Sequence, residues 1–130
     1  MYKNILFIED EQFIAELYAQ VLELNGFKVK IIGDGLEGYE EAKKGGYDLI
    51  LLDLMLPNMT GMEILRRLRN PSQSPQAPKD MSVVALTNLE EDDVMKKEIK
   101  QLAQGYLLKV EITPKELVGI INKMAGKKTT

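Results

Sequence analysis

Five short apolar segments, separated by longer amphipathic ones, constrain the fold of this chain more than any other feature. The apolar segments, predicted as strands, cover residues 5–8, 29–32, 49–52, 83–86 and 106–108. Between them, apolar residues recur every three or four positions, which predicts helices. Strands that alternate with helices are typical of parallel sheets covered on both faces. The sequence therefore predicts an α/β fold with a doubly wound, five-stranded parallel sheet.

The helical segments carry signals for their buried faces and for their ends. The predicted buried positions are Phe13, Ile14, Leu17, Val21 and Leu24 in the first helix, Ile64, Leu65 and Leu68 in the third, Val94, Met95, Ile99 and Leu102 in the fourth, and Leu117, Val118, Ile121 and Met124 in the fifth. Thr60 with Glu63, and Thr113 with Glu116, match the capping box that begins a helix. Asp34 with Glu37 is a weaker version of the same signal.

The chain has 130 residues, which is the size of one domain. We therefore expect a single domain over residues 1–130, with its core in residues 3–125. Residues 70–80 include Pro71, Pro75 and Pro78 and predict a long, exposed loop that is a tolerated surface insertion. Residues 126–130 predict a flexible tail.

Composition excludes several classes of function. The chain has no cysteine and no histidine, which excludes disulfides, zinc–thiolate sites and Ser-His or Cys-His catalytic pairs. Its net charge of −3 argues against direct binding of nucleic acid. No apolar run is long enough to cross a membrane, and the first run is too short for a signal peptide. We therefore expect a cytoplasmic protein that binds neither nucleic acid nor membrane.

Polar residues follow four of the predicted strands where the chain leaves the sheet. Glu9 and Asp10 follow the first strand, and Asp53, Thr87 and Lys109 follow the third, fourth and fifth. Ligands of doubly wound sheets bind beyond the carboxyl ends of the strands, so we expect these residues at one site. Asp53 is the sharpest signal, because a carboxylate in so apolar a segment needs a charged partner or a metal.

The predicted site favours a divalent cation and phosphoryl chemistry. Converging carboxylates either bind a cation or take up protons. Oxygen ligands without histidine or cysteine suit Mg²⁺, Mn²⁺ or Ca²⁺, and a site with few carboxylates and open water positions suits Mg²⁺ best, with Mn²⁺ as an alternative. A cation, the Lys109 ammonium and the Thr87 hydroxyl around Asp53 would accommodate a phosphoryl group. Asp53 is then the expected nucleophile, because a carboxylate can form an acyl phosphate.

Five segments of the chain, taken together, resemble one known family. They are residues 5–11, residues 48–57, Gly61, residues 85–87 and residues 105–109. In this order and at these spacings, residues 3–125 resemble the receiver domain of bacterial response regulators, the CheY-like superfamily of two-component signalling. The resemblance implies a flavodoxin-like three-layer sandwich with the strand order 2-1-3-4-5.

The resemblance also implies a phosphorylation-activated signalling switch. Asp53 would accept a phosphoryl group from a sensor histidine kinase or a phosphotransfer protein. Asp10 and Asp53 would ligate Mg²⁺, with Glu9 acting mainly through water and the Met55 backbone carbonyl as a further ligand. Lys109 would pair with the phosphoryl oxygens.

A change of surface would follow from phosphorylation. By the resemblance, Thr87 would hydrogen-bond the phosphoryl oxygens, and Tyr106 would change rotamer as Thr87 moves. This would alter the surface made by the fourth helix, the fifth strand and the fifth helix, which would meet a downstream effector protein or a second copy of the chain. The chain is not expected to be an enzyme, because it would catalyse only its own phosphorylation and dephosphorylation.

Two positions depart from the family pattern. Val110 stands where the family usually has a proline, often after a cis bond, so we expect either a trans bond with a shifted loop or a strained cis bond. Asn88 follows Thr87 where the family favours a small residue, which predicts an altered turnover of the phosphoryl group.

Three other functions compete with this interpretation. A degenerate receiver would bind proteins without phosphorylation, and the intact set of charged residues argues against it. A Mg²⁺-dependent phosphohydrolase typically needs an acid two residues after its nucleophile, where this chain has Met55, which cannot transfer protons. A flavin-binding domain of the same topology would bind phosphate after the first strand, where Glu9, Asp10 and Glu11 would repel it.

Overall fold

Strands and helices alternate through the whole fold, as predicted. The computed structural model describes residues 4–77, 81–88 and 91–129, with side chains described to residue 124. The elements are β1 (Asn4–Ile8), α1 (Gln12–Leu24), β2 (Lys28–Ile32), α2 (Gly35–Lys43), β3 (Leu49–Asp53), α3 (Gly61–Leu68), β4 (Ser82–Thr87), α4 (Asp93–Leu102), β5 (Gly105–Leu108), the 3₁₀ turn η1 (Lys109–Glu111) and α5 (Pro114–Thr129).

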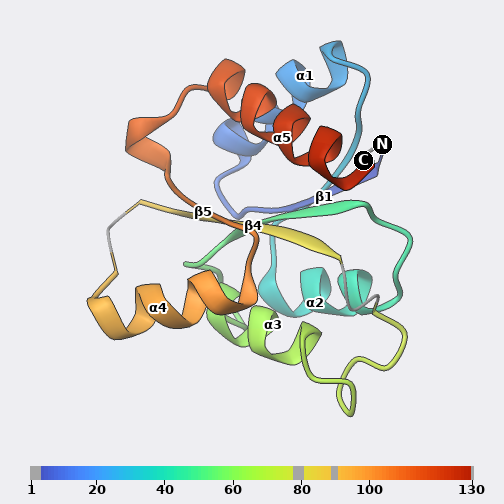
Figure 1. Cartoon of the computed structure of the whole chain (residues 1–130), viewed down its shortest axis with the longest axis vertical. Coiled ribbons are helices and arrows are strands. Elements are labelled where there is room, and N and C mark those ends of the chain that lie inside the picture. Colours follow the sequence, from blue (N-terminus) through green and yellow to red (C-terminus); the bar gives the residue numbers. More distant parts are fainter. Residues whose placement is uncertain (1–3, 78–80, 89–90, 130) are drawn as a thin grey trace.

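The sheet confirms the predicted topology. Its strands are all parallel and lie in the order β2-β1-β3-β4-β5. Helices α1 and α5 cover one face, and α2, α3 and α4 cover the other (Figure 1). The result is the three-layer sandwich expected of a doubly wound sheet.

Two apolar cores lie on opposite faces of the sheet. Along β1, Ile5 and Phe7 pack toward α1 and α5, whereas Leu6 and Ile8 pack toward the other three helices. Strands β3 and β4 are buried at every position. Because helices cover both faces of the sheet, the sequences of the central strands are continuously apolar and do not alternate between apolar and polar residues.

The buried face of α1 differs from the predicted one. The helix buries Ala15, Tyr18, Ala19 and Leu22. Of these, Ala15, Tyr18 and Leu22 belong to the core that α1 shares with α5 and the sheet. Three of the predicted core residues are exposed instead: Phe13 at 77%, Leu17 at 40% and Leu24 at 80%. Both sides of α1 carry apolar residues, so the apolar pattern alone does not identify the buried side. Val94 of α4, another predicted core residue, is 82% exposed.

The predicted helix starts are confirmed by their hydrogen bonds. The Thr60 hydroxyl accepts the Glu63 N–H at 3.2 Å. Thr113 and Glu116 form the reciprocal pair of the capping box, at 3.1 and 3.0 Å. These side chains satisfy backbone donors that have no partner within the helix, and so they set where α3 and α5 begin.

The proline-containing segment is more embedded than a surface insertion. Ser74 is 2% exposed and Ala77 is 9% exposed, whereas residues 78–80 of the predicted loop lie outside the described residues. The Ser74 hydroxyl lies 2.8 Å from both the Arg67 carbonyl oxygen and the Tyr39 hydroxyl. Most described positions of this segment are exposed, as predicted, but the hydrogen bonds of Ser74 hold it against α2 and α3.

The C-terminal helix is longer than expected. Helix α5 extends to Thr129, so residues 126–129 belong to the assigned helix, where the sequence predicts a flexible tail. Among the helices of the described residues, none has the length and apolarity needed to cross a membrane.

Candidate functional site

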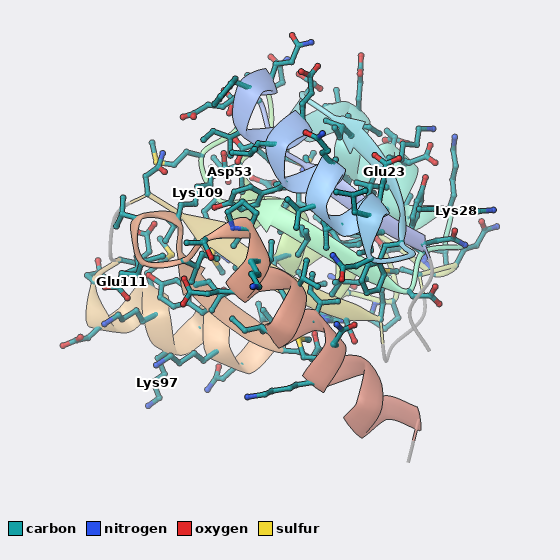
Figure 2. All side chains as sticks on the ribbon, turned by 90° about the horizontal axis from the view of Figure 1, so that it is seen from above. Glu23, Lys28, Asp53, Lys97, Lys109 and Glu111 are labelled. Carbon is teal, nitrogen blue, oxygen red and sulfur yellow. The ribbon has the colours of Figure 1, made fainter. Side chains whose placement is uncertain are left out.

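The carboxyl ends of four strands bring the predicted site residues together. Parallel registry pairs Ile8 with Leu52 and Thr87 with Leu108, so the strands end at the same edge of the sheet. Glu9 and Lys109 lie one residue beyond the ends of β1 and β5, and Asp53 and Thr87 are the last residues of β3 and β4. Figure 2 shows Asp53 and Lys109 together at this edge.

Lys109 bridges two buried carboxylates. Its Nζ donates to Glu9 Oε1 and lies 3.3 Å from Asp53 Oδ2. The exposed fractions of the three side chains are 6% for Lys109, 0% for Glu9 and 3% for Asp53. Charges buried to this degree persist only when they are paired and hydrogen-bonded, and here one ammonium faces two carboxylates. The group therefore carries an excess of negative charge.

The pKa values of this group reflect that excess. Burial, followed by the hydrogen bond and the negative charge of Asp53, raises the pKa of Glu9 to about 7, and Lys109 offsets this only in part. For Lys109, burial alone would lower the pKa, but the hydrogen bond to Glu9 and the charges of Asp53 and Glu9 outweigh it and raise the pKa. Lys109 thus keeps its charge, and Glu9 takes up a proton near neutral pH when no cation is bound.

Three carboxylates are close enough to share a cation. One oxygen each from Glu9, Asp10 and Asp53 lies within 4.8 Å of the others. Glu9 and Asp53 are buried, whereas Asp10 is exposed. One side of the cluster is therefore enclosed by the protein, and the other faces solvent. Carboxylate oxygens with access for water are the donor set that Mg²⁺ prefers, and the residues present fit that ion.

A hollow of about 470 Å³ opens beside this cluster. Its lining consists of Asp10, Glu11, Asp53, Leu54, Met55, Leu56, Thr60 and Asn88. The Met55 N–H donates to Asp53 Oδ1 at 3.1 Å, which places the Met55 backbone next to the carboxylate. The Met55 side chain is 62% exposed and brings no acid to the site.

Two backbone amides that the sequence analysis did not single out also contact site residues. The Glu11 N–H donates to Glu9 Oε2 at 3.3 Å. The Glu91 N–H donates to the Tyr106 hydroxyl at 3.1 Å, so Tyr106 of β5 is tied to the segment after β4. Thr87, the last residue of β4 and another predicted site residue, is fully buried. The sequence could not predict these two contacts, because the donor is a backbone N–H, which every residue except proline has.

The two departures from the family pattern have distinct places in the structure. No peptide bond in the described ranges is cis, so the Lys109–Val110 bond is trans and the expected strained alternative is excluded. Lys109 nevertheless remains within 3.3 Å of Asp53. The Asn88 side chain is exposed and lines the hollow, close to the site, and its effect on phosphoryl turnover stays a prediction.

Comparison with known proteins points to one family. The chain matches the family model of the response regulator receiver domain over residues 5–122. It is 38% identical over 106 residues to the transcriptional regulatory protein CusR of Escherichia coli K12, which covers 82% of this chain and 44% of that protein. It is 48% identical over 72 residues to the response regulator ArlR of Staphylococcus saprophyticus, which covers 55% and 33%.

Solved structures give the same result. The chemotaxis protein CheY4 of Vibrio cholerae superposes with a TM-score of 0.78 at 28% identity, covering 95% of this chain and 98% of that chain. The receiver domain of the sensor histidine kinase PA1611 of Pseudomonas aeruginosa, with a magnesium ion coordinated in its active site cleft, superposes with a TM-score of 0.79 at 25% identity, covering 97% and 99%.

The chain spans less than half the length of these curated relatives, with 44% of CusR and 33% of ArlR matched. Its match to the family model, by contrast, covers nearly all of the chain. The fold, the converging strand ends and the family match agree, and the chain belongs to the response regulator receiver domain family.

Proposed function

We propose that this chain is a phosphorylation-activated signalling switch whose phosphoryl acceptor is Asp53. One observation carries the proposal. The Asp53 carboxylate lies 3.3 Å from the Lys109 ammonium and also within the carboxylate cluster of Glu9 and Asp10. A nucleophile is thus held between a cationic side chain and a set of cation ligands, beside a hollow that opens to solvent.

In the proposed reaction, an Asp53 oxygen attacks the phosphorus of a phosphohistidine on a sensor histidine kinase or a phosphotransfer protein. The new O–P bond forms as the N–P bond breaks, and the electron pair of that bond leaves with the imidazole. Lys109 offsets the negative charge on the phosphoryl oxygens, and the Thr87 hydroxyl donates a hydrogen bond to them. The product is an aspartyl phosphate.

We assign the cation site to Asp10 and Asp53, with Glu9 acting mainly through water and the Met55 carbonyl as a further ligand. When bound at these residues, Mg²⁺ or Mn²⁺ would supply positive charge to the phosphoryl oxygens. Support comes from the proximity of the three carboxylates and from the Met55 N–H contact with Asp53. The residues themselves hold the nucleophile and exclude water from its buried side.

Exposed apolar side chains near the site suit a protein phosphodonor. Phe13, at 77% exposure, lies in the first turn of α1, three residues after Asp10. Val110, at 78% exposure, directly follows Lys109. Exposed apolar residues beside a reactive group favour contact with another protein, and we propose that this region receives the donor.

For the output, we propose that phosphorylation changes the surface formed by α4, β5 and α5, which contacts an effector protein or a second copy of the chain. The Tyr106 hydroxyl links β5 to the segment before α4 through the Glu91 N–H. As in the family pattern, we propose that Tyr106 changes rotamer when Thr87 moves toward a phosphoryl group, and that the contact with Glu91 passes this change to the segment before α4. The proposed location is the cytoplasm, with neither membrane nor nucleic acid as a direct partner.

Intact-mass analysis tests this function. The purified chain is incubated with Mg²⁺ and a small phosphodonor, and we expect a gain of one phosphoryl group that disappears in Asp53→Asn and after chelation of the metal. Asp48→Asn is the matched control, because Asp48 precedes the same strand at its opposite end. If the wild type gains no mass, the chain is instead a phosphorylation-independent binding module. If the gain survives Asp53→Asn, Asp53 is not the phosphoryl acceptor and the proposal fails.

A further inference from the structure

We propose that Asp34 and Asn58 are positioning residues that fix the loop carrying Met55. Their hydrogen bond joins the start of α2 to the β3–α3 loop, residues 54–60, which leads away from Asp53. We infer that this contact holds the Met55 backbone at the cation site. The inference rests on the proposed function, since it concerns the geometry of that same site.

The conformation of Asn58 is the first observation. Its φ is 68°, and among the described residues it is the only non-glycine with a positive φ. Asparagine tolerates this left-handed conformation better than most residues. Held in this way, its side-chain amide donates to Asp34 Oδ1.

The acceptor is itself held in place. Asp34 is the N-cap of α2, and its Oδ2 accepts the Glu37 N–H at 2.9 Å. One carboxylate therefore uses one oxygen to cap a helix and the other to hold the loop. Because the carboxylate is anchored to a helix end, the Asn58 contact ties the loop to a rigid element rather than to a mobile side chain.

The two segments also touch through their backbones. The Gly35 N–H donates to the Pro57 carbonyl oxygen at 3.0 Å. A Cβ built on Gly35 would overlap the Met59 carbonyl oxygen and would lie 2.9 Å from the Pro57 oxygen. Only glycine permits so close an approach, which leaves no room for the loop to shift toward α2.

Backbone contacts fix both ends of the loop. The Leu54 N–H donates to Leu86 O at 3.0 Å, and the Gly61 N–H donates to Leu54 O at 3.2 Å. Between these ends, the Met55 side chain is 62% exposed and cannot hold its own backbone by packing. The Met55 N–H donates directly to Asp53 Oδ1 at 3.1 Å. The Asn58 contact is a second polar side-chain link, which ties the middle of the loop to α2 and so supports the position of the Met55 backbone beside Asp53.

Exchanging the two side chains tests the inference. In Asp34→Asn, the oxygen can still cap Glu37, but the new NH₂ group then faces the Asn58 NH₂. In Asn58→Asp, two carboxylates face each other. In the double variant, the new amide at position 34 would donate to the new carboxylate at position 58, so the hydrogen bond returns with its direction reversed. Asn58→Gly keeps the left-handed backbone and removes only the side-chain contact.

Two readouts are compared well below the unfolding temperature of each variant. In the metal-free protein, hydrogen exchange of the Gly35 N–H is expected to become about tenfold faster in each single variant. Calorimetric titration with MgCl₂ is expected to show about tenfold weaker binding. The double variant should return to within about threefold of the wild type in both measurements, and Asn58→Gly should resemble the single variants.

Three outcomes would overturn the inference. Wild-type values of both quantities in the single variants, or a double variant as impaired as they are, would overturn the inference. So would a change in hydrogen exchange without a change in Mg²⁺ binding, because the loop would then not position the site. A wild type that binds Mg²⁺ but never gains a phosphoryl group would refute the proposed function alone, since neither readout depends on phosphorylation.

Discussion

Lys109 and Glu9 lie 100 residues apart in the chain and form a buried ion pair at the carboxyl edge of the sheet. Asp53 completes the group, with its Oδ2 at 3.3 Å from the Lys109 Nζ. Because one ammonium faces two carboxylates, the balance of charge in this group depends on Lys109, on protons and on any bound cation.

Replacing Lys109 by methionine should lower both the rate of phosphorylation and the unfolding free energy. Without the ammonium, phosphorylation by a small phosphodonor is expected to slow by at least about tenfold, because charge on the phosphoryl oxygens loses a partner. The unfolding free energy at pH 8 should fall by about 2–4 kcal/mol, since two buried carboxylates then lack their cation. Urea denaturation and intact-mass kinetics measure the two effects. Lys97→Met, an exposed control on α4, should change stability by less than about 0.5 kcal/mol.

The stability of the metal-free protein should depend on pH through Glu9. Its pKa is raised from 4.5 to about 7 in the folded chain, so the folded state binds more protons than the unfolded state between these values. The contribution of Glu9 is therefore most favourable below about pH 4.5 and is lost as the pH rises through 7. Relative to Glu9→Gln, the wild type should lose roughly 1–3 kcal/mol from pH 4.5 to 8 in urea denaturation. A pH-independent difference between the two proteins would contradict this.

Binding of Mg²⁺ should strengthen with pH over the same range. A cation at this cluster displaces the proton from Glu9, so proton competition weakens binding below about pH 7. Between pH 6 and pH 8, we expect the affinity to rise by roughly threefold to tenfold in calorimetry. Asp10→Asn should weaken binding at both pH values, whereas Glu9→Gln should flatten the pH dependence. Equal affinity of the wild type at both values would count against a proton-linked site.

The exposed end of α1 should affect transfer from a protein donor only. Phe13→Ala is expected to slow phosphoryl transfer from a phosphohistidine protein by about fivefold or more, through loss of apolar contact. Transfer from a small phosphodonor should be unchanged, because Phe13 is not among the residues that hold the acceptor. Leu24→Ala, equally exposed at the far end of the same helix, is the control. If both substitutions have the same effect, the donor does not dock beside the site.

The embedded segment after α3 should contribute to stability but not to phosphorylation. Tyr39→Phe removes the hydroxyl that contacts Ser74 Oγ at 2.8 Å and the Gln73 carbonyl oxygen at 3.0 Å. We expect a loss of about 1–2 kcal/mol in urea denaturation, because a buried polar group loses a partner. Ser72→Ala, on the exposed part of the same segment, should stay within about 0.5 kcal/mol of the wild type. An unchanged stability of Tyr39→Phe would show that the hydrogen bonds of the Tyr39 hydroxyl do not stabilise the segment.

Local sequence patterns were enough to predict the strands of the sheet and the residues at which the helices begin. The run Leu49–Leu52 is continuously apolar because both faces of β3 are covered, and this is visible in the sequence alone. The Thr113 and Glu116 cap depends on residues three apart, so it too could be predicted. The buried face of α1 could not, because apolar residues occur on both sides of that helix and only packing against α5 and the sheet selects between them.

The chain by itself determined which polar residues follow the strands, since Glu9, Asp53 and Lys109 each stand at the end of an apolar run. Tertiary structure alone decided that Glu9 pairs with Lys109. It also decided the contact between Asn58 and Asp34, which lie on different loops. Strand position is encoded by neighbouring residues. Partner choice depends on strand order, on backbone contacts such as that of Gly35 with Pro57, and on burial, which exist only once distant segments have been brought together.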